Sequence, residues 1–402
     1  MDEFGEGRVD YLDPSAAAAA NHERPLKDYT TKVKKRRAGM DIPFLLLTLV
    51  ILAIGVVMVL SASFARSYYT EGNPTYYFMR QLGFAALGVI VMLLLSRLPM
   101  SFYRKMTVPV FLASLLLLIA VLFIGIGEEE SGARRWINLG FTTFQPSEAI
   151  KIAEIMLFAV MVCNYRDKMK TFKYGVLPFA VVVAVICFLL YKEPHLSAAV
   201  IVIAIAVAMM FAGGTKSIWF IIGLVAIAVI GVLIVTKMSY ANARITSWLH
   251  PEVDPLGDSY QTNQSLYAVG SGGLFGLGLG QGRQKYLYLP EEHNDFIFAI
   301  VCEELGFIGA VLVLALFALL IIRGFWLALH IRDRYGSLLV TGISSMLAIQ
   351  VFLNVGVVTN LLPNTGIALP FFSYGGTALV MQLAEMGIVL AASRDIPLRK
   401  AG

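Results

Sequence analysis

The residues with the greatest potential for chemistry lie in one stretch, LPEEHNDFIFAIVCEELG, which runs from position 289 to position 306. Glu291, Glu292, His293 and Asp295 crowd together just before an apolar run that predicts a helix. A carboxylate at such a place can act as a general base if it comes within hydrogen-bond reach of the proton that it removes. Asp295 also suits a structural role, because an acid at the N-cap or in the first turn stabilises a helix. Both roles of Asp295 stay open on spacing alone.

The same stretch closes a long polar segment that covers positions 237 to 304. A structureless loop of this length is uncommon in a compact protein and is usually functional. Within it, positions 259 to 269 predict a short amphipathic helix that rests on a bilayer surface. Seven glycines follow between positions 270 and 282. No strand precedes them, so a nucleotide-binding loop is not indicated.

A second group of charged residues lies in SGARRWINLGFTTFQPSEAIKIAEIM. Glu148, Lys151 and Glu154 recur at a spacing of three residues, which places them on one slanted stripe of a helix. Ionisable residues in an apolar helix are expensive and usually face a bundle interior or a water-filled cavity. Two interpretations stay open: a structural Glu-Lys pair, or a site where Lys151, with Arg134 and Arg135 above it, receives an anion such as pyrophosphate.

Further polar residues interrupt the apolar sequence elsewhere. Glu303 and Glu304 lie deeper in the helix that follows Asp295, and as buried acids they need partners, for which Lys151 is a candidate. The segment TNLLPNTGIALPFFSYGGTAL carries two prolines and three glycines, as where a transmembrane helix breaks around a cavity. His195, in KEPHLSA, suits an interfacial position better than a ligand position, and Glu385 lies in mid-span with no assigned partner.

The elements that must position these residues are membrane helices. The chain has 402 residues, of which 58% are hydrophobic and 15% charged, and its mean hydropathy is +0.73; about 25% charged is typical of soluble domains. We therefore predict an all-α polytopic membrane protein. Apolar runs long enough to span a bilayer predict ten transmembrane helices, near positions 43–64, 78–96, 107–126, 146–163, 174–191, 196–212, 217–236, 296–322, 337–359 and 367–392.

The distribution of Lys and Arg predicts the orientation. Most of the 32 basic residues fall in segments that are cytoplasmic if the N-terminus is cytoplasmic. We expect a disordered basic cytoplasmic tail at 1–42, a membrane domain at 43–395 with an extracytoplasmic loop at 237–295 between helices 7 and 8, and a cytoplasmic tail at 396–402. The net charge of +5 is thus a topology signal, and nucleic acid is not an expected partner. The three cysteines show no metal-site spacing and no disulfide framework, and no cleavable signal peptide is indicated.

Five motifs, taken in order, resemble the SEDS family (shape, elongation, division and sporulation), whose members include FtsW, RodA and SpoVE: GARRWI, QPSEAIK, YQTNQS, LPEEHNDFIFAIVCEELGFIG and LPNTGIALPFFSYGG. The resemblance covers about residues 40 to 395, and the residues of its motifs favour the FtsW and SpoVE branch. It implies ten transmembrane helices and a peptidoglycan glycosyltransferase of the cell membrane, acting in cell-wall biogenesis, that polymerises lipid II on the outer side. It also implies a class B penicillin-binding protein, the transpeptidase, as partner.

The resemblance places the family's essential aspartate on Asp295. It also matches a lysine to Lys151, an Arg-Trp pair to Arg135 and Trp136, and paired acids to Glu303 and Glu304. The chain departs from the family where KEPHLSA replaces a QPDLGT-like run, since His195 cannot supply a fixed negative charge. Asn294 and the pair Thr359-Asn360 are smaller departures. The residues expected to bind substrate are Arg134, Arg135, Trp136, Lys151, Gln264, Ser265, His293 and Glu304.

The mechanism expected from this resemblance is a single displacement. The 4-hydroxyl of one lipid II attacks the anomeric carbon of another, Asp295 takes the proton, and undecaprenyl pyrophosphate leaves with inversion. The residues indicate no definite cofactor. The residues leave open whether Arg134, Arg135, Lys151 or a divalent cation such as Mg²⁺ or Mn²⁺ offsets the pyrophosphate charge.

Two rival functions stay open from the residues. The first is a lipid II flippase or another transporter, because charged groups inside ten spans also suit a translocation path. The second is a scaffold that holds a transpeptidase without turnover. A role in division, at the septum, is not distinguished from one in elongation or sporulation.

Overall fold

The structure is a computed structural model, and it describes residues 39–128, 133–140, 142–237, 239–252, 254–257 and 259–396. These residues belong to one compact unit. Nearly all of the predicted tail at 1–42, and the tail at 396–402 apart from its first residue, lie outside them. The proposed boundaries of the tails therefore stay predictions.

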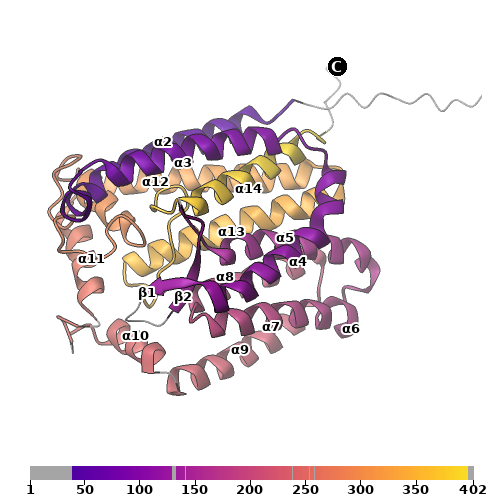
Figure 1. The fold of residues 1–402 in the computed structure, drawn as a ribbon. Helices are drawn as coiled ribbons and strands as arrows, with labels where there is room; N and C mark the ends of the chain where they lie inside the picture. The colour runs from indigo at the N-terminus through magenta and orange to yellow at the C-terminus, as the bar shows by residue number, and fades with distance from the viewer. Residues whose placement is uncertain are drawn as a thin grey trace, which may run out of the picture. The chain divides into compact units, whose positions relative to one another are not determined.

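Each of the ten predicted apolar runs forms at least one helix (Figure 1). In the described residues, seven helical spans are long and apolar enough to cross a membrane: α2 (Ile42–Glu71), α3 (Tyr76–Leu95), α4 (Met100–Ile124), α6 and α7 together (Phe172–Gly175 and Leu177–Lys192), α8 (Leu196–Gly213), α12 (Ile297–His330) and α13 (Arg334–Val358). The other predicted runs form α5 (Pro146–Asn164), α9 (Ser217–Lys237) and α14 (Thr377–Ser393). The all-helical polytopic membrane fold is confirmed.

Two helices differ from the prediction, one in the residue at which it begins and the other in an internal break. The last span was expected to begin near residue 367, but α14 begins at Thr377 and residues 359–376 form an irregular segment. Pro363 and Pro370 interrupt the helix because proline lacks an amide donor and clashes with the preceding turn. Along α12 the backbone is non-helical at Gly306, where φ is 68°. The break in the last apolar run thus brings backbone groups to the end of the bundle, as expected for a segment that lines a cavity.

A small antiparallel sheet, absent from the prediction, precedes α5. It pairs β1 (Ile126–Glu128) with β2 (Ala133–Asn138), and β2 with β3 (Thr143–Phe144). The strands are too short to give an alternating hydrophobic pattern, and they lie in a part of the sequence that was interpreted as a loop. Because β2 contains Arg135 and Trp136, the sheet fixes both residues beside the start of α5.

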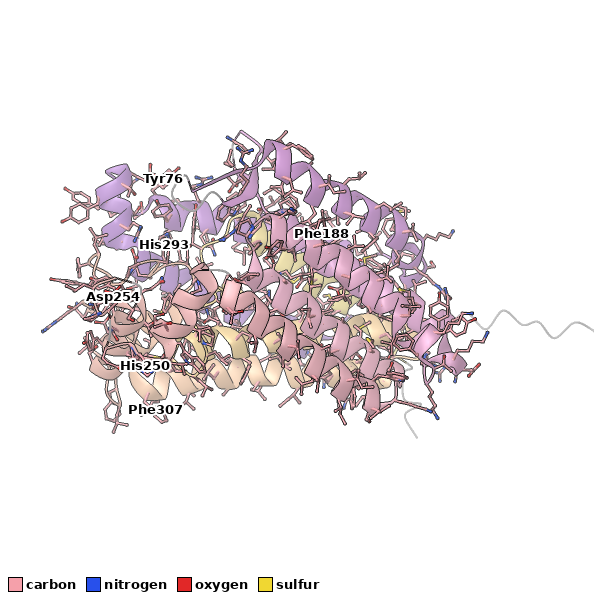
Figure 2. The ribbon with its side chains drawn as sticks, turned by 90° about the horizontal axis from the view of Figure 1, so that it is seen from below. Tyr76, Phe188, His250, Asp254, His293 and Phe307 are labelled. Atoms are coloured by element: carbon pink, nitrogen blue, oxygen red, sulfur yellow. The ribbon has the colours of Figure 1, made fainter. Side chains whose placement is uncertain are left out.

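The long polar segment before α12 contains two helices, α10 (Ser239–Leu249) and α11 (Tyr260–Ser271). Both lie at one end of the bundle, opposite to α6 (Figure 1); we call this the loop end. Figure 2 shows Tyr76, His293 and Asp254 at the same end. The amphipathic helix predicted at 259–269 is present as α11. α11 packs against α12 and α13, with Thr262, Ser265 and Ala268 buried and Tyr267 exposed, and its contact with a bilayer surface stays a prediction.

Two buried carboxylates of α12 hold the glycine-rich segment that follows α11. Glu303 accepts hydrogen bonds from the amides of Arg283 (2.7 Å) and Gln284 (3.2 Å). Glu304 accepts from the amides of Gly280 (3.0 Å) and Gly282 (3.3 Å). These acids therefore serve as anchors for main-chain donors that would otherwise be unsatisfied.

The charge partner of Glu304 differs from the one considered in the sequence. Lys285 Nζ lies 2.7 Å from Glu304 Oε1, and Ser61 on α2 donates to the same carboxylate at 2.7–2.8 Å. Lys151 instead lies 2.8 Å from Glu148, in an i, i+3 pair within α5. The expected pairing of Lys151 with Glu304 is wrong, because a nearer cation lies on the loop that Glu304 anchors.

Candidate functional site

A cavity of about 990 Å³ lies at the loop end. Its walls come from the end of α2, α3, the sheet, α5, the α7–α8 turn with the start of α8, α10, α11, the segment before α12, α13, and the irregular segment before α14 with the start of α14. Segments from nearly the whole length of the chain therefore meet there. Its charged and amide side chains are Glu71, Arg80, Arg135, Asn138, Gln145, Glu148, Lys151, His195, Arg244, Gln261, Glu291, Asn294, Asp295, Gln350, Asn364 and Gln382.

Asp295 directly precedes the N-cap of α12, which is Phe296 and receives no side-chain capping bond. The capping interpretation of Asp295 is therefore not supported. Its carboxylate faces the wall formed by Gly366, where an added Cβ would lie 3.0 Å from Asp295 Oδ2. Glycine at this position, with φ of +65°, lets the backbone approach the carboxylate closely.

The surroundings of Asp295 disfavour its charged form. Burial is the main cause that raises its pKa to about 6, and the negative charge of Glu291 adds to it. The positive charges of Arg244 and Arg135, and His293, act in the opposite direction. A carboxylate with a pKa in this range is ionised at neutral pH yet basic enough to accept a proton from a bound hydroxyl.

Four arginine and lysine side chains line the same cavity: Arg80, Arg135, Lys151 and Arg244. Arg135 donates to the main-chain carbonyl of Pro194 at 2.6 Å, and Arg244 donates to that of Asn364 at 2.7 Å. Lys151, whose side chain is 2% exposed, is paired with Glu148. Cations held in a partly dehydrated cavity interact strongly with an anionic ligand. The arrangement can therefore hold a phosphate or pyrophosphate group beside Asp295.

The α7–α8 turn carries two buried titratable groups, of which His195 lines the cavity and Glu193 does not. Burial raises the pKa of Glu193 to about 8, with Arg135 opposing the shift. Burial lowers the pKa of His195 to about 3, and Arg135 and Lys151 add to this shift. At neutral pH both groups are therefore uncharged. The turn that replaces the family's usual acidic run thus offers neutral polar groups beside Arg135.

The backbone around Asp295 is tied to neighbouring elements. His293 stacks on Tyr77 with ring centroids 5.0 Å apart, and its main-chain carbonyl accepts from the amide of Tyr374 at 2.9 Å. Ser373 Oγ donates to the carbonyl of Asn294 at 2.8 Å. The short segment before α12 is therefore fixed to the α2–α3 turn and to the irregular segment before α14.

The predicted site residues divide into two groups. Asp295, Arg135, Trp136 and Lys151 line the cavity, whereas Arg134, Gln264, Ser265, His293 and Glu304 do not. Ser265, for example, donates to the carbonyl of Val358 at 2.8 Å and joins α11 to α13. These five residues do not line the cavity, and a role in substrate binding remains a prediction for them.

The sequence analysis missed several cavity residues, among them Arg244, Gln261, Gln350 and Asn364. Asn364 lies in the PNTG break that was noted, and its amide donates to Gln261 Oε1 at 2.7 Å. Arg244 is a lone arginine shortly after the seventh span, on the side with few basic residues. That exception to the charge distribution was a usable signal, whereas Gln350 inside α13 gave none.

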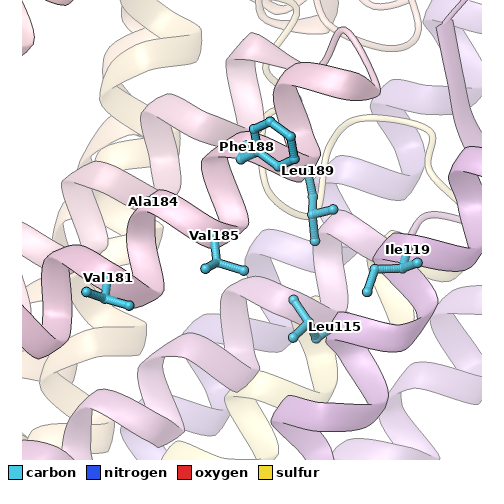
Figure 3. A pocket seen from close by; sticks show the side chains of 7 residues that line it. All are labelled: Leu115, Ile119, Val181, Ala184, Val185, Phe188 and Leu189. Carbon is cyan, nitrogen blue, oxygen red and sulfur yellow. The ribbon is translucent and has the colours of Figure 1, made fainter.

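A second hollow, of about 400 Å³, lies between α4 and α7 (Figure 3). Its lining is entirely apolar: Leu115, Ile119, Val181, Ala184, Val185, Phe188 and Leu189. With no titratable or nucleophilic side chain, this hollow offers no chemistry. The described residues also contain no group of three or more His, Cys, Asp and Glu side chains that could hold a metal ion.

Comparisons with known proteins agree on one family. Residues 42–396 match the family of cell cycle proteins FtsW, RodA and SpoVE. The chain is 41% identical to stage V sporulation protein E of Bacillus subtilis, over 89% of this chain and 98% of the relative. It is 40% identical to the probable peptidoglycan glycosyltransferase FtsW of Trichlorobacter lovleyi, over 90% of this chain and 95% of the relative.

Solved structures show the same fold. A structure described as the coordination of polymerization and crosslinking by a peptidoglycan synthase complex aligns with a TM-score of 0.74 and 31% identity, over 89% of this chain and 98% of the other. The crystal structure of the rod shape determining protein RodA of Thermus thermophilus aligns with a TM-score of 0.65 and 29% identity, over 90% and 98% of the two chains.

Proposed function

This chain belongs to the FtsW, RodA and SpoVE family of cell cycle proteins, and we propose that it is a peptidoglycan glycosyltransferase whose general base is Asp295. Its substrate is lipid II, which it polymerises into glycan strands for division or sporulation. The observation that supports this most directly is the position of Asp295, a carboxylate of raised pKa in a large cavity with two arginines in electrostatic reach.

The reaction requires one carboxylate side chain as its general base. The 4-hydroxyl of an acceptor attacks the anomeric carbon of a donor, Asp295 accepts the hydroxyl proton, and the bond to undecaprenyl pyrophosphate breaks. Because pyrophosphate leaves well without protonation, no second carboxylate is needed, unlike in glycoside hydrolases. The single displacement inverts an α-linked donor into a β-1,4-linked product.

The cationic wall supplies the remaining electrostatic stabilisation. Negative charge grows on the pyrophosphate as the glycosidic bond breaks, and fixed cations in a partly dehydrated site stabilise it without reorganising at the moment of reaction. Arg135, Arg244 and Lys151 line the cavity that contains Asp295. We assign the pyrophosphate to this wall, and the acceptor hydroxyl to the side of the cavity nearest Asp295 and Gly366.

We further infer that the loop end faces the outside of the cell. The excess of Lys and Arg in segments at the opposite end supports a cytoplasmic N-terminus and C-terminus. Lipid II would then enter from the outer leaflet. The structural similarity to a peptidoglycan synthase complex supports a class B penicillin-binding protein as the transpeptidase partner, which would crosslink the strands that this chain makes.

The proposed function is tested by polymerisation of pure lipid II. Wild type, Asp295→Asn and Glu252→Gln would be purified, checked for folding, and assayed alone and with the transpeptidase. Glu252, 70% exposed, is a matched acid outside the cavity. We expect glycan strands from wild type and Glu252→Gln, and none from Asp295→Asn. Polymer from folded Asp295→Asn would refute the assignment of the base.

The same preparation separates the rival functions. In vesicles with labelled lipid II, a flippase moves lipid across the bilayer without making polymer. A scaffold does neither. Absence of polymer from wild type under all conditions would therefore overturn the glycosyltransferase proposal itself.

A further inference from the structure

Asn354 on α13 makes two hydrogen bonds that join the segments on both sides of the Asp295 carboxylate. Its Nδ2 donates to the main-chain carbonyl of Asp295 and to that of Ile367, each at 2.7 Å. The side chain is 1% exposed. One buried amide group therefore satisfies two carbonyls from parts of the chain that do not pair with each other as secondary structure.

The two carbonyls matter because of what lies beside them. Ile367 directly follows Gly366, whose backbone packs closely against Asp295 Oδ2. The amide of Asn354 thus fixes both the backbone of Asp295 and the wall against its carboxylate. Both segments are irregular, so no helix or sheet fixes their relative position.

The chemistry at this position requires an amide. Two converging carbonyl acceptors need two N–H donors on one neutral group, which the Asn side chain supplies. Asn354 Oδ1 is buried and has no hydrogen-bond partner in the described part of the chain. A reversed amide would place this oxygen against two carbonyl oxygens, so the two bonds define the orientation of the side chain.

We propose that Asn354 is a positioning residue for the glycosyl transfer reaction, holding Asp295 and the Gly366 wall in the geometry in which the carboxylate meets the acceptor hydroxyl. The inference rests on the proposed function of Asp295 as base. It goes further by assigning a role to a residue that is buried behind the cavity wall and does not line the cavity. A displacement of a catalytic group by about 1 Å lowers a rate by about 100-fold, so the two bonds of Asn354 carry a large kinetic effect.

The test uses the full chain with lipid II, and measures kcat, KM and the rate as a function of pH. Asn354→Leu keeps the approximate volume and removes both donors, whereas Asn354→Gln keeps both donors on a longer stem. Ser337→Ala is the matched control, because Ser337 lies at the other end of α13 and donates to the carbonyl of Ala328 at 2.7 Å. Thermal unfolding and gel filtration establish that each variant is folded.

We expect Asn354→Leu to lower kcat by at least about 30-fold with KM changed less than about 3-fold. Asn354→Gln should retain more activity than Asn354→Leu, and Ser337→Ala should match wild type. Release of the Gly366 wall also admits water to Asp295, so the acid limb of the rate–pH profile should move to lower pH. A purely structural role would lower the unfolding temperature and leave the acid limb unmoved.

The inference is overturned if folded Asn354→Leu keeps the wild-type kcat, or if its acid limb does not move. Should Asn354→Leu fail to fold, Asn354→Ala, which also removes both donors, decides by the same criterion. Asp295→Asn, assayed in parallel, separates the two proposals. Activity in Asp295→Asn refutes the assignment of Asp295 as the base, whereas an inactive Asp295→Asn beside a fully active Asn354→Leu refutes the role of Asn354 alone.

Discussion

Arg66 holds the carboxylate of Glu292 at two points, with Nε 2.9 Å from Oε1 and a terminal guanidinium nitrogen 3.0 Å from Oε2. The pair joins α2 to the short segment that carries Asp295. The Glu292 side chain is 0% exposed and that of Arg66 is 27% exposed. Because a buried charge is costly without a partner, this contact stabilises the segment only while both residues are present.

Arg66→Ala should therefore destabilise the protein strongly, by about 3 kcal/mol, since it leaves a buried carboxylate unpaired. Contacts with His293 and Arg66 lower the pKa of Glu292 against the opposing effect of burial. A lowered pKa contributes stability above the ordinary value of 4.5 that is lost as the pH falls below it. Thermal unfolding at pH 7 and pH 4 should show a larger effect of Arg66→Ala at pH 7.

The double variant Arg66→Ala/Glu292→Gln is the control for this pair. Removing both charges should recover part of the stability lost in Arg66→Ala, because no unpaired charge is then buried. Equal unfolding temperatures for the single and double variants would contradict the assignment of the pair as the cause.

The rate of polymerisation should depend on pH with an acid limb near pH 6. The base must be ionised to accept a proton, and burial raises the pKa of Asp295 to about 6. Since the negative charge of Glu291 contributes to this shift, Glu291→Gln should move the acid limb to lower pH. Glu252→Gln, an exposed change away from the cavity, should leave the limb in place. An acid limb that shifts equally in Glu291→Gln and Glu252→Gln would contradict a local effect of the Glu291 charge on the pKa of Asp295.

The ionised carboxylate of Asp295 is also expected to lower the stability of the protein at neutral and alkaline pH. A pKa raised from 3.8 to about 6 means that stability contributed by the neutral carboxyl group is present below pH 3.8 and lost as the pH rises through 6. Asp295→Asn keeps a neutral group at all pH values. It should therefore raise the unfolding temperature at pH 8 relative to wild type and have little effect at pH 4. A variant that is less stable than wild type at pH 8 would indicate another role for the carboxylate.

Apolar run length predicted the helices well, because a membrane helix must satisfy its backbone internally over a fixed thickness. The charged positions inside those runs were equally informative. Lys151 and Asp295 both line the cavity. Lys151 lies inside a predicted run and Asp295 directly before one, where charged residues are costly and usually face a bundle interior or a cavity, although the sequence left a structural role open for both.

Partners across the chain could not be read in the same way. Lys285 pairs with Glu304, whereas Lys151 was the candidate partner in the sequence. Residue spacing identifies only neighbours on one helix, so it could not reveal this pair. The sheet that holds Arg135 was missed, since its strands are short and lie between loops. Asn354 is visible in the sequence as a polar residue inside the ninth apolar run, but its role depends on two main-chain carbonyls that come together only in the fold.

The two glycines at the end of α11 should respond oppositely to alanine. An added Cβ at Gly272 would lie 2.0 Å from the main-chain oxygen of Cys302, whereas one at Gly270 would meet nothing within 4 Å. Gly270→Ala should be stabilising by up to about 1 kcal/mol, through its higher helix propensity. Gly272→Ala should be strongly destabilising, because α11 must move away from α12. Thermal unfolding checks both, and similar unfolding temperatures for the two variants would contradict the close packing of α11 on α12.

Gly366→Ala should impair catalysis beyond its effect on folding. Gly366 and Gly214 both have positive φ values, +65° and +85°, so alanine costs about 1–2 kcal/mol of backbone strain at either position. An added Cβ at Gly214 would meet nothing within 4 Å, whereas at Gly366 it would lie 3.0 Å from Asp295 Oδ2. Gly214→Ala is thus a control that carries the strain without crowding the base. We expect similar losses of unfolding temperature in the two variants, with kcat reduced at least about 10-fold only in Gly366→Ala, since displacement of a positioned base is costly. Equal activity in the two variants would show that the contact between Gly366 and Asp295 does not set the position of the carboxylate during the reaction.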